Sequence, residues 1–390
     1  MSEKRIFLCA ERFFPRGDAG ANRVLFIAKA LKNRGWDVMV LSIGKNDPEH
    51  YREGRYFYEG IPYENIVCKT SGILQKAERR LLNGRKTVSL LKKHGFRSTD
   101  KGYIYASTAA YTRAVLKYAQ KCGVSVAADV VEWHQPFQFR FGTLDPWYRS
   151  FRKCFDHLFP EAKNVIAISR LLQEHFFEKG CNVLKLPIYI EVREAFRYAP
   201  KDEILHLIYP GNPYKKDSLE TMLSALAALG GEEKRRVCLH LTGASRKLLE
   251  RSVPGKESLL DLPCVRIHEW MEYRELTELY QYMDFALIVR EDTVITRANF
   301  PSKVPELMDC GIPVIINPVG DIREYLKPGK NAVLLRDSSV NGCTSVIRQC
   351  LQMDRDEMER MHKAAFESAA ELFDYRQCEK SLDDFFSNLK

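Results

Sequence analysis

The stretch Asn299-Phe-Pro-Ser-Lys-Val-Pro-Glu-Leu-Met-Asp-Cys-Gly-Ile-Pro-Val-Ile-Ile316 contains the beginning and the end of a short helix, followed by a strand. Ser302 is placed to cap a helix from Lys303 to Cys310, because its hydroxyl group can accept a hydrogen bond from a first-turn N–H. Gly311 allows the left-handed turn that ends a helix, and Val314–Ile316 is an apolar, β-branched run typical of a buried parallel strand. The stretch is either an ordinary helix–strand unit of an α/β sheet or the wall of an anion site at the helix N-terminus.

A second strand–loop–helix unit precedes this stretch. Residues 204–209 predict a strand and residues 218–229 an Ala/Leu-rich helix. The loop between them places Gly211, Lys215 and Lys216 at the carboxyl end of the strand, where ligands of open α/β sheets bind. Backbone amides and ammonium groups there form either a diphosphate cradle or a solvated turn.

A further strand, residues 284–290, ends at the same predicted sheet edge and brings Arg290 to it. Arg290 is either a contact to an anionic ligand or a structural partner of Glu291 or Asp292.

The N-terminal half begins with a βαβ pattern. Residues 5–10 and 36–42 predict strands, and a loop containing Gly17 and Gly20 leads into the helix between them. The Gly17-Asp-Ala-Gly20 loop lacks the three spaced glycines of a dinucleotide fingerprint. The pattern predicts a first Rossmann-like domain with a ligand-facing loop.

His134 follows another predicted strand, residues 124–132, and therefore lies near the carboxyl edge of the N-terminal sheet. A histidine in this position either reaches a crevice between two domains or is a packed structural residue.

Composition indicates a globular protein of two or three domains: the chain has 390 residues, 45% of them hydrophobic and 28% charged. No apolar run approaches the ~20 residues of a membrane span, and the N-terminus resembles no signal peptide, so a cytoplasmic location is expected. The 11 cysteines occur singly, which predicts reduced thiols and no structural metal. The net charge of +9 suggests an anionic partner.

Two segments are rich in basic residues. Residues 69–101 carry ten Lys or Arg against two acidic residues, with leucines at helical spacing, and predict either peripheral contact with a membrane or a solvated helix face. Residues 137–159 interleave aromatic and basic side chains. No nucleic-acid motif accompanies them, so core packing with a rim facing an acceptor is expected, and no nucleic-acid partner.

Nearly the whole chain resembles the group 1, family-four retaining glycosyltransferases, including those that build bacterial surface polysaccharides. Four motifs carry this resemblance: the Gly17–Arg23 loop, Gly211-Asn-Pro-Tyr-Lys-Lys216, Val265-Arg-Ile-His-Glu-Trp270 with Glu278–Asp284, and Phe300-Pro-Ser-Lys-Val-Pro-Glu306 with Asp309–Val314. The resemblance implies an α/β protein of GT-B architecture, in which two Rossmann-like domains face a cleft. It implies an N-terminal acceptor-side domain (1–192), a nucleotide-sugar domain (193–373) and a C-terminal helix (374–390) that returns to the N-terminal domain.

The same resemblance implies functional residues. Glu306 matches the second acid of a Glu-x7-Glu motif, whereas Ala298 stands where the first acid is expected. Lys216, with Lys215, matches a basic residue on the diphosphate, and His134 matches a histidine that contacts the transferred sugar. The implied catalytic residues are His134, Lys216 and Glu306; the implied donor-binding residues are Gly17, Gly20, Gly211, Lys215, Lys216, Arg290, Phe300, Ser302, Lys303 and Glu306.

The expected activity is transfer of a sugar from a nucleotide-diphosphate sugar to the hydroxyl group of a saccharide or lipid-linked acceptor, with retention at the anomeric carbon. Cationic side chains are expected to neutralise the leaving diphosphate, so neither a metal ion nor a cofactor is expected. Two alternatives stay open: a nucleotide-sugar epimerase of the same fold, and a catalytically silent subunit that binds nucleotide, which Ala298 suggests.

Overall fold

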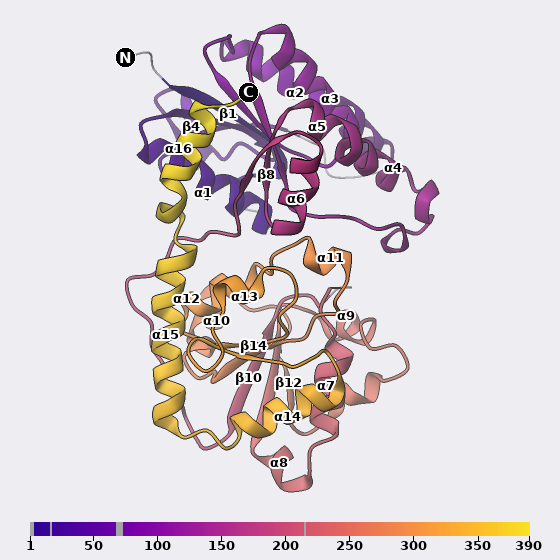
Figure 1. Ribbon diagram of the computed structural model, residues 1–390, viewed down its shortest axis with the longest axis vertical. Coiled ribbons are helices and arrows are strands. Elements are labelled where there is room, and N and C mark those ends of the chain that lie inside the picture. The colour runs from indigo at the N-terminus through magenta and orange to yellow at the C-terminus, as the bar shows by residue number, and fades with distance from the viewer. Residues whose placement is uncertain (1–3, 16–17, 68–72, 214–215) are drawn as a thin grey trace. The chain divides into compact units, whose positions relative to one another are not determined.

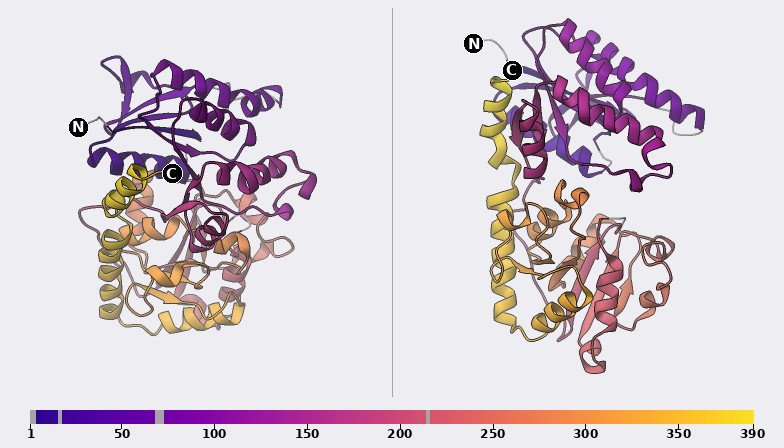
Figure 2. Two further views of the ribbon diagram at one scale, coloured as in Figure 1. Left: turned by 45° about the horizontal axis from the view of Figure 1, so that its top comes forward. Right: turned by 45° about the vertical axis from the view of Figure 1, so that its right-hand side comes forward.

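The computed structural model describes residues 4–15, 18–67, 73–213 and 216–390. The chain forms two compact units (Figure 1). Unit 1 contains residues 1–191 and 375–390, and unit 2 contains residues 192–374. Each unit is built on one sheet with helices on both faces, the arrangement of a doubly wound α/β fold (Figure 2).

Unit 1 has a nine-stranded sheet in the order β3-β4-β5-β2-β1-β6-β7-β8-β9. The strands from β5 across to β9 pair in parallel, and β3 and β4 add an antiparallel edge. The strands are β1 (Arg5–Phe13), β2 (Asp37–Ile43), β3 (Tyr51–Arg52), β4 (Arg55–Tyr58), β5 (Ile61–Ile66), β6 (Lys101–Tyr105), β7 (Val126–Val130), β8 (Asn164–Ala167) and β9 (Asn182–Lys185).

Helices cover both faces of this sheet (Figure 1). They are α1 (Ala19–Asn33), α2 (Ile73–Lys93), α3 (Ala109–Lys121), α4 (Pro146–Lys153), α5 (Phe159–Glu161), α6 (Arg170–Glu178) and α16 (Glu379–Ser387). The last helix, α16, belongs to the core of unit 1, because Leu382, Phe385 and Phe386 are buried in the same cluster as Trp36 and the apolar face of α1. Asp383 on α16 also accepts a hydrogen bond from Trp36 Nε1 at 2.9 Å.

Unit 2 has six strands, all parallel, in the order β12-β11-β10-β13-β14-β15. The strands are β10 (Leu205–Pro210), β11 (Val237–Thr242), β12 (Val265–Ile267), β13 (Phe285–Ile288), β14 (Val314–Ile316) and β15 (Ala332–Leu334). The helices are α7 (Leu219–Ala227), α8 (Gly231–Arg235), α9 (Arg246–Glu250), α10 (Tyr273–Tyr280), α11 (Val294–Arg297), α12 (Lys303–Asp309), α13 (Ile322–Tyr325), α14 (Val340–Cys350) and α15 (Arg355–Phe373). Strand order reverses between β10 and β13, which is where ligands of such sheets bind.

The opening stretch forms the predicted helix and strand, α12 and β14. Gly311 has φ +73°, the left-handed conformation expected at the end of the helix. The predicted cap is wrong: Ser302 has helical angles (φ −58°, ψ −25°), and its side chain makes no capping hydrogen bond. A capping residue needs an extended backbone to turn its hydroxyl group back toward the first-turn amides, and Ser302 lacks it.

His362 on α15 gives unit 2 a predictable pH dependence. Its ring is 1% exposed and stacks on Tyr198 with centroids 3.7 Å apart, and burial lowers its pKa to about 3 from 6.5. Below pH 6.5 the unfolded chain therefore binds a proton that the folded chain does not, so this group costs stability as pH falls toward 3. We expect the free energy of unfolding, measured with urea and far-UV circular dichroism, to fall less between pH 7 and pH 5 in His362→Gln than in the unsubstituted chain. In the matched control His157→Gln, it should fall as much as in the unsubstituted chain. The same dependence of the free energy of unfolding on pH in His362→Gln and in the unsubstituted chain would contradict this prediction.

Candidate functional site

The site in unit 2 is formed by the segments that follow β10 and β13, together with α12. Gly211 has φ +82°, and its N–H donates to Thr242 O at 2.7 Å. The loop that it begins is tied to the end of β13, where Ser218 N–H donates to Val289 O at 2.7 Å. A side chain at position 211 would meet Lys303 Cε at 3.7 Å. The glycine loop and the first residue of α12 are therefore neighbours at the strand-order reversal.

Asp217 is the centre of a polar cluster at this edge. Its Oδ2 accepts from Lys303 Nζ at 2.8 Å and from the Tyr209 hydroxyl group at 2.7 Å. Arg290 Nε lies 3.3 Å from Asp217 Oδ1. Lys303 Nζ also contacts the Tyr209 hydroxyl group. Two cations thus share one carboxylate.

The protonation states of these groups follow from their surroundings. Burial by itself would raise the pKa of Asp217, but the charges of Lys303 and Arg290 outweigh it, so this pKa is lowered. Burial lowers the pKa of both Lys303 and Arg290, and Asp217 opposes the shift in each. The carboxylate is ionised, and the cluster of three charges carries a net positive charge when both cations are protonated.

Arg290 is 1% exposed, which separates it from the surface on which a ligand would lie. Its Nη2 donates to Asn299 Oδ1 at 2.6 Å, whereas Nε and Nη1 make no hydrogen bond within the described parts of the chain. Its ion-pair partner among the described residues is Asp217, and Asp292 pairs with Arg297. Arg290 holds Asp217 and Asn299 in place.

The structure brings some predicted donor-binding residues together and separates others. Lys303 has 20% of its side chain exposed, and Glu306, one turn later on α12, is exposed. Desolvation by the surrounding protein raises the pKa of Glu306 above the usual glutamate range, although the side chain keeps exposed area. Ser302 and Lys216 are half-buried. Lys215 lies outside the described residues.

Phe300 is a core residue and does not line this surface. It is 3% exposed and packs between Tyr325 and Phe373, with ring centroids 5.1 and 5.7 Å away. Ala298 ends α11 and is fully buried. An acidic side chain at that position would have to bury its carboxylate in the core, so the missing first acid is consistent with local packing.

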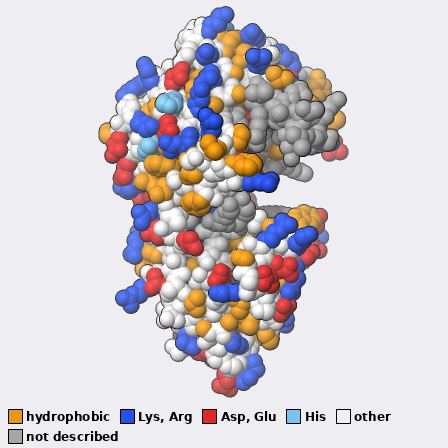
Figure 3. Space-filling view, turned by 90° about the vertical axis from the view of Figure 1, so that its right-hand side faces the viewer, with side chains coloured by type: hydrophobic (Ala, Val, Ile, Leu, Met, Phe, Trp, Pro, Cys, Tyr) orange, Lys and Arg blue, Asp and Glu red, His pale blue; other side chains and the backbone are white. Residues whose placement is uncertain are grey.

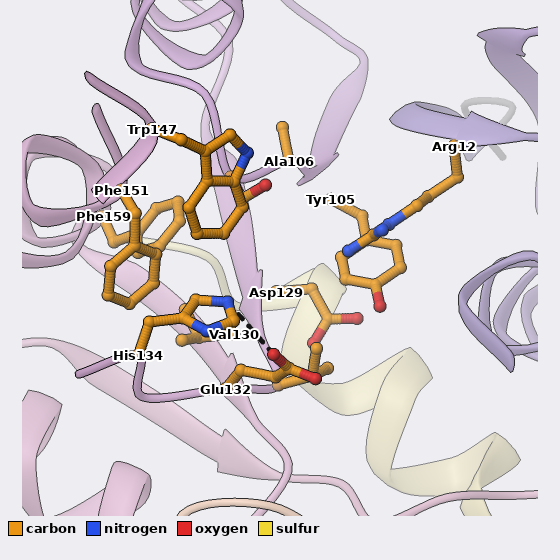
Figure 4. Close-up of a pocket in the computed structure, with 12 residues that line it drawn as sticks. Arg12, Tyr105, Ala106, Asp129, Val130, Glu132, His134, Trp147, Phe151 and Phe159 are labelled. Atoms are coloured by element: carbon orange, nitrogen blue, oxygen red, sulfur yellow. Dashed lines mark ion pairs between the residues drawn. The ribbon is translucent and has the colours of Figure 1, made fainter. Parts of the chain in front are cut away.

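Unit 1 contains a pocket of about 220 Å³ at the carboxyl edge of its sheet. Figure 4 shows that His134 and Glu132 lie on one wall, with His134 Nε2 3.0 Å from Glu132 Oε2. The His134 ring packs edge-on against Trp147 and Phe151, with centroids 4.8 and 4.7 Å apart. The structure thus places His134 in a pocket with a carboxylate partner and an aromatic wall.

The opposite wall of this pocket is formed by Arg12 and Tyr105 (Figure 4). The Arg12 guanidinium group lies over the Tyr105 ring, 4.9 Å from its centroid. Arg12 Nε is buried and makes no hydrogen bond to the described residues. Arg12 is the last but one residue of β1, Tyr105 ends β6, and Glu132 follows β7. Their position near the carboxyl ends of strands was the signal in the sequence that could have identified them.

The glycine loop of unit 1 forms the N-terminal cap of helix α1. Asp18 caps α1, and its Oδ1 accepts from Gly20 N–H at 2.9 Å. A side chain at Gly20 would lie 3.0 Å from Asp18 Oδ1 and from Tyr105, so glycine permits this close approach. Gly17 lies outside the described residues.

A group of potential metal ligands lies apart from both sites. His206, Cys238 and His240 have ligand atoms within 4.8 Å of one another. The ring nitrogens already form a chain of hydrogen bonds, 2.9 Å from His206 to His240 and 2.9 Å from His240 to His268. The sequence also contains an Asp-x-Asp triplet, Asp354-Arg-Asp356, a pattern that can bind a metal ion. Here it lies at the start of α15, and Asp354 caps that helix by accepting from Glu357 N–H at 2.7 Å.

Residues 205–353 match the family model described as glycosyl transferases group 1. This stretch of unit 2, 149 of the 390 residues, is therefore similar to the group 1 glycosyl transferases. The matched stretch spans the strands of unit 2 and the whole polar cluster around Asp217. Among curated proteins, none matches the chain significantly.

Solved structures similar to this chain cover both units. Sucrose-phosphate synthase from Thermosynechococcus elongatus is 14% identical over 99% of this chain and 98% of its own, with a TM-score of 0.72. HepE from Anabaena, solved with UDP and glucose, is 15% identical over 99% and 100%, with a TM-score of 0.69. WaaG, a glycosyltransferase involved in lipopolysaccharide biosynthesis, is 15% identical over 98% and 100%, with a TM-score of 0.65. At these identities the likeness concerns the fold, and it confirms the predicted GT-B architecture of two parallel-sheet units.

Proposed function

We propose that this protein is a glycosyltransferase that moves a sugar from a nucleotide-diphosphate donor to an acceptor hydroxyl group, with retention at the anomeric carbon. The observation that supports this proposal best is the cluster in which Lys303 and Arg290 share the carboxylate of Asp217. Asp217 is one anion beside these two cations, and the diphosphate of a donor would be the second. Two of the three N–H donors of Lys303 have partners among the described residues, Asp217 and Tyr209, which leaves one for a phosphate oxygen.

The chemistry of transfer requires this charge. Breaking the bond between the sugar and the diphosphate leaves negative charge on the leaving group, and a fixed cation stabilises it more strongly in the transition state than in the ground state. Lys303 and Lys216 are the cations that we assign to this role, in place of a metal ion. Arg290 is a positioning residue, because its side chain is buried behind Asp217 and Asn299.

The pocket of unit 1 is the acceptor side in this proposal. Its lining combines an aromatic face at Trp147 with polar groups at Arg12, Glu132 and His134, which suits a sugar with one apolar face and several hydroxyl groups. HepE, a structural relative, was solved with UDP and glucose, and WaaG takes part in lipopolysaccharide biosynthesis. A saccharide or lipid-linked saccharide is the acceptor class that we propose.

A screen of nucleotide-diphosphate sugars tests the proposal. A true donor binds the native chain and raises its melting temperature by mass action. The same donors are then incubated with saccharide acceptors, and nucleotide release and the anomeric configuration of the product are measured by NMR. Isomerised donor in the absence of acceptor would identify an epimerase instead. Binding without any turnover would identify the silent subunit that Ala298 suggests.

Glu306→Gln is expected to weaken donor binding. Glu306 is exposed one turn after Lys303, where its carboxylate can accept hydrogen bonds from a ribose. Losing a hydrogen bond to a charged group costs about 1.5–3 kcal/mol, so the donor dissociation constant should rise roughly tenfold or more. Isothermal titration with the identified donor measures it. Glu359→Gln, an equally exposed glutamate on α15, is the matched control and should leave the constant unchanged; equal effects of the two substitutions would remove Glu306 from the site.

A further inference from the structure

Two histidines and a cysteine lie together on one face of the sheet of unit 2. The strand register pairs His206 on β10 with Cys238 on β11, and His240 lies two residues further along β11, so the three side chains point to the same side of the sheet. Their ligand atoms lie within 4.8 Å of one another. His206 and Cys238 are the second residues of their strands, whereas the cluster around Asp217 lies beyond the carboxyl end of β10. The group is therefore separate from the candidate donor site.

These polar side chains lie within the fold. Strands of a parallel sheet that is covered on both faces usually carry apolar side chains, but here His240 and Cys238 are buried, and only 14% of the His206 side chain is exposed. On the face of unit 2 that Figure 3 draws, charged side chains of both signs are interspersed and no histidine of the described residues is visible. Because buried polar groups need partners, the contacts of these rings indicate what the group can bind.

The hydrogen bonds around the group turn one nitrogen of each histidine ring toward the other ring. Asp202 Oδ1 accepts from His206 Nε2 at 3.1 Å, and because a carboxylate only accepts, this nitrogen carries the proton. The neutral His206 ring then presents an unprotonated Nδ1, 2.9 Å from His240 Nε2. On its other side, His240 Nδ1 lies 2.9 Å from His268 Nε2, which is able to accept a proton from it. Asp202 and His268 are thus placed as the outer partners that orient metal-binding histidines.

We propose that His206 Nδ1, His240 Nε2 and Cys238 Sγ bind one Zn²⁺ ion, with water as the fourth ligand. Tetrahedral zinc places two ring nitrogens about 3.3 Å apart and a nitrogen and a thiolate sulfur about 3.6 Å apart. The nitrogens, now 2.9 Å apart, have to separate only slightly, and the sulfur has to approach them by no more than about 1 Å. On binding, the Cys238 thiol releases its proton to solvent, and the His240 proton is held on Nδ1, where it is donated to His268.

The ligand set selects the type of metal ion. Imidazole and thiolate bind zinc and similar transition metals, whereas Mg²⁺ and Ca²⁺ take oxygen ligands. The sequence predicted no structural metal because its cysteines occur singly, and His206 and Cys238 are brought together only by the pairing of β10 with β11. Bound zinc would join these two strands and stabilise unit 2. The proposal is independent of the transferase activity, because the three ligands are not part of the Asp217 cluster.

Zinc titration of the full chain tests the proposal, after metal ions have been removed with EDTA in the presence of a reductant. We expect calorimetry with ZnCl₂ to show one ion bound per chain, with a dissociation constant of about 1 μM or below. Excess MgCl₂ should not compete. Because zinc binds the native state, it should also raise the melting temperature.

Cobalt identifies the ligands. Co²⁺ in the same site should give a thiolate-to-cobalt charge-transfer band in the near ultraviolet and the intense visible bands of tetrahedral coordination. Cys238→Ala should abolish the charge-transfer band and weaken zinc binding at least about 100-fold, because the thiolate ligand is lost. Asp202→Ala removes only an outer partner, so it should weaken zinc binding about 10–100-fold and leave the charge-transfer band in place at saturation.

The matched control is Cys122→Ala/His157→Gln, which removes a cysteine that is not buried and an exposed histidine. It should bind zinc and cobalt like the unsubstituted chain. Circular dichroism verifies that each variant is folded, and His206→Gln, with the same expected loss of zinc affinity, takes the place of Cys238→Ala if that variant is not. The proposal is overturned if the chain binds no stoichiometric zinc, if the cobalt complex lacks the charge-transfer band, or if the ligand variant binds zinc as tightly as the control.

Discussion

Lys303→Met is expected to lower the turnover number of sugar transfer by about 10²–10³-fold, the loss typical when one fixed group that stabilises transition-state charge is removed. Methionine keeps the length of the side chain and removes only the ammonium group. Lys303 is the partly exposed cation of the Asp217 cluster, whereas Arg290 is buried, so Lys303 is the member that can meet a phosphate oxygen. Steady-state measurement of nucleotide release with the identified donor gives the turnover number.

The fold should survive this substitution, which makes the kinetic loss interpretable. Asp217 keeps the Tyr209 hydroxyl group at 2.7 Å and Arg290 at 3.3 Å as partners, so its carboxylate is not left buried and unpaired. The matched comparison is Lys216→Met, in the loop that follows β10. A much larger loss for Lys303 than for Lys216 assigns the leaving-group role to α12. Unchanged turnover in Lys303→Met, with a loss in Lys216→Met, would return that role to the loop.

Much of the fold follows from local patterns. The α12–β14 unit was predicted because Gly311 and the run Val314–Ile316 are local signals, and the structure places them as expected. The ten described cysteines are free, and nine are buried, as their single occurrence suggested. The antiparallel edge of β3, β4 and β5 was not predicted, because β3 has two residues and β4 four, too short for a periodicity.

The candidate site was harder to predict from the sequence than the fold. Gly211, Lys303 and Glu306 were named from motifs, but Asp217 was not, because its partners Lys303 and Arg290 lie 86 and 73 positions further along the chain and no local pattern links them. Phe300 was predicted to bind the donor, but it packs in the core. The sequence alone does not show whether an aromatic residue beside a motif faces a ligand or the core. Side-chain direction decided both cases, and it depends on tertiary packing.

Of the electrostatic interactions within unit 1, we expect that of Arg23 in α1 to contribute most to the free energy of unfolding. Its Nε and Nη2 bind the two oxygens of Asp129 at 2.7 and 2.9 Å, and its Nη1 donates to Pro187 O at 2.8 Å. The two side chains are 3% and 0% exposed. Burial alone would lower the pKa of Arg23, but Asp129 outweighs it and raises this pKa. The pair joins α1, β7 and the segment after β9.

Arg23→Met should therefore lower the free energy of unfolding of unit 1 by about 3–5 kcal/mol, because it leaves the Asp129 carboxylate buried with Tyr103 as its one remaining hydrogen-bond partner among the residues that the structure describes. Asp129→Asn added to Arg23→Met should recover part of this loss, since no uncompensated charge then remains. Urea unfolding is followed by tryptophan fluorescence in a Trp270→Phe background, so that the three remaining tryptophans, 36, 133 and 147, all report on unit 1. Arg348→Met, which breaks the exposed pair with Glu233 in unit 2, is the control and should leave this transition unchanged. If Arg23→Met unfolds at the same urea concentration as the control, the buried pair contributes no net stability, and desolvation cancels its Coulombic attraction.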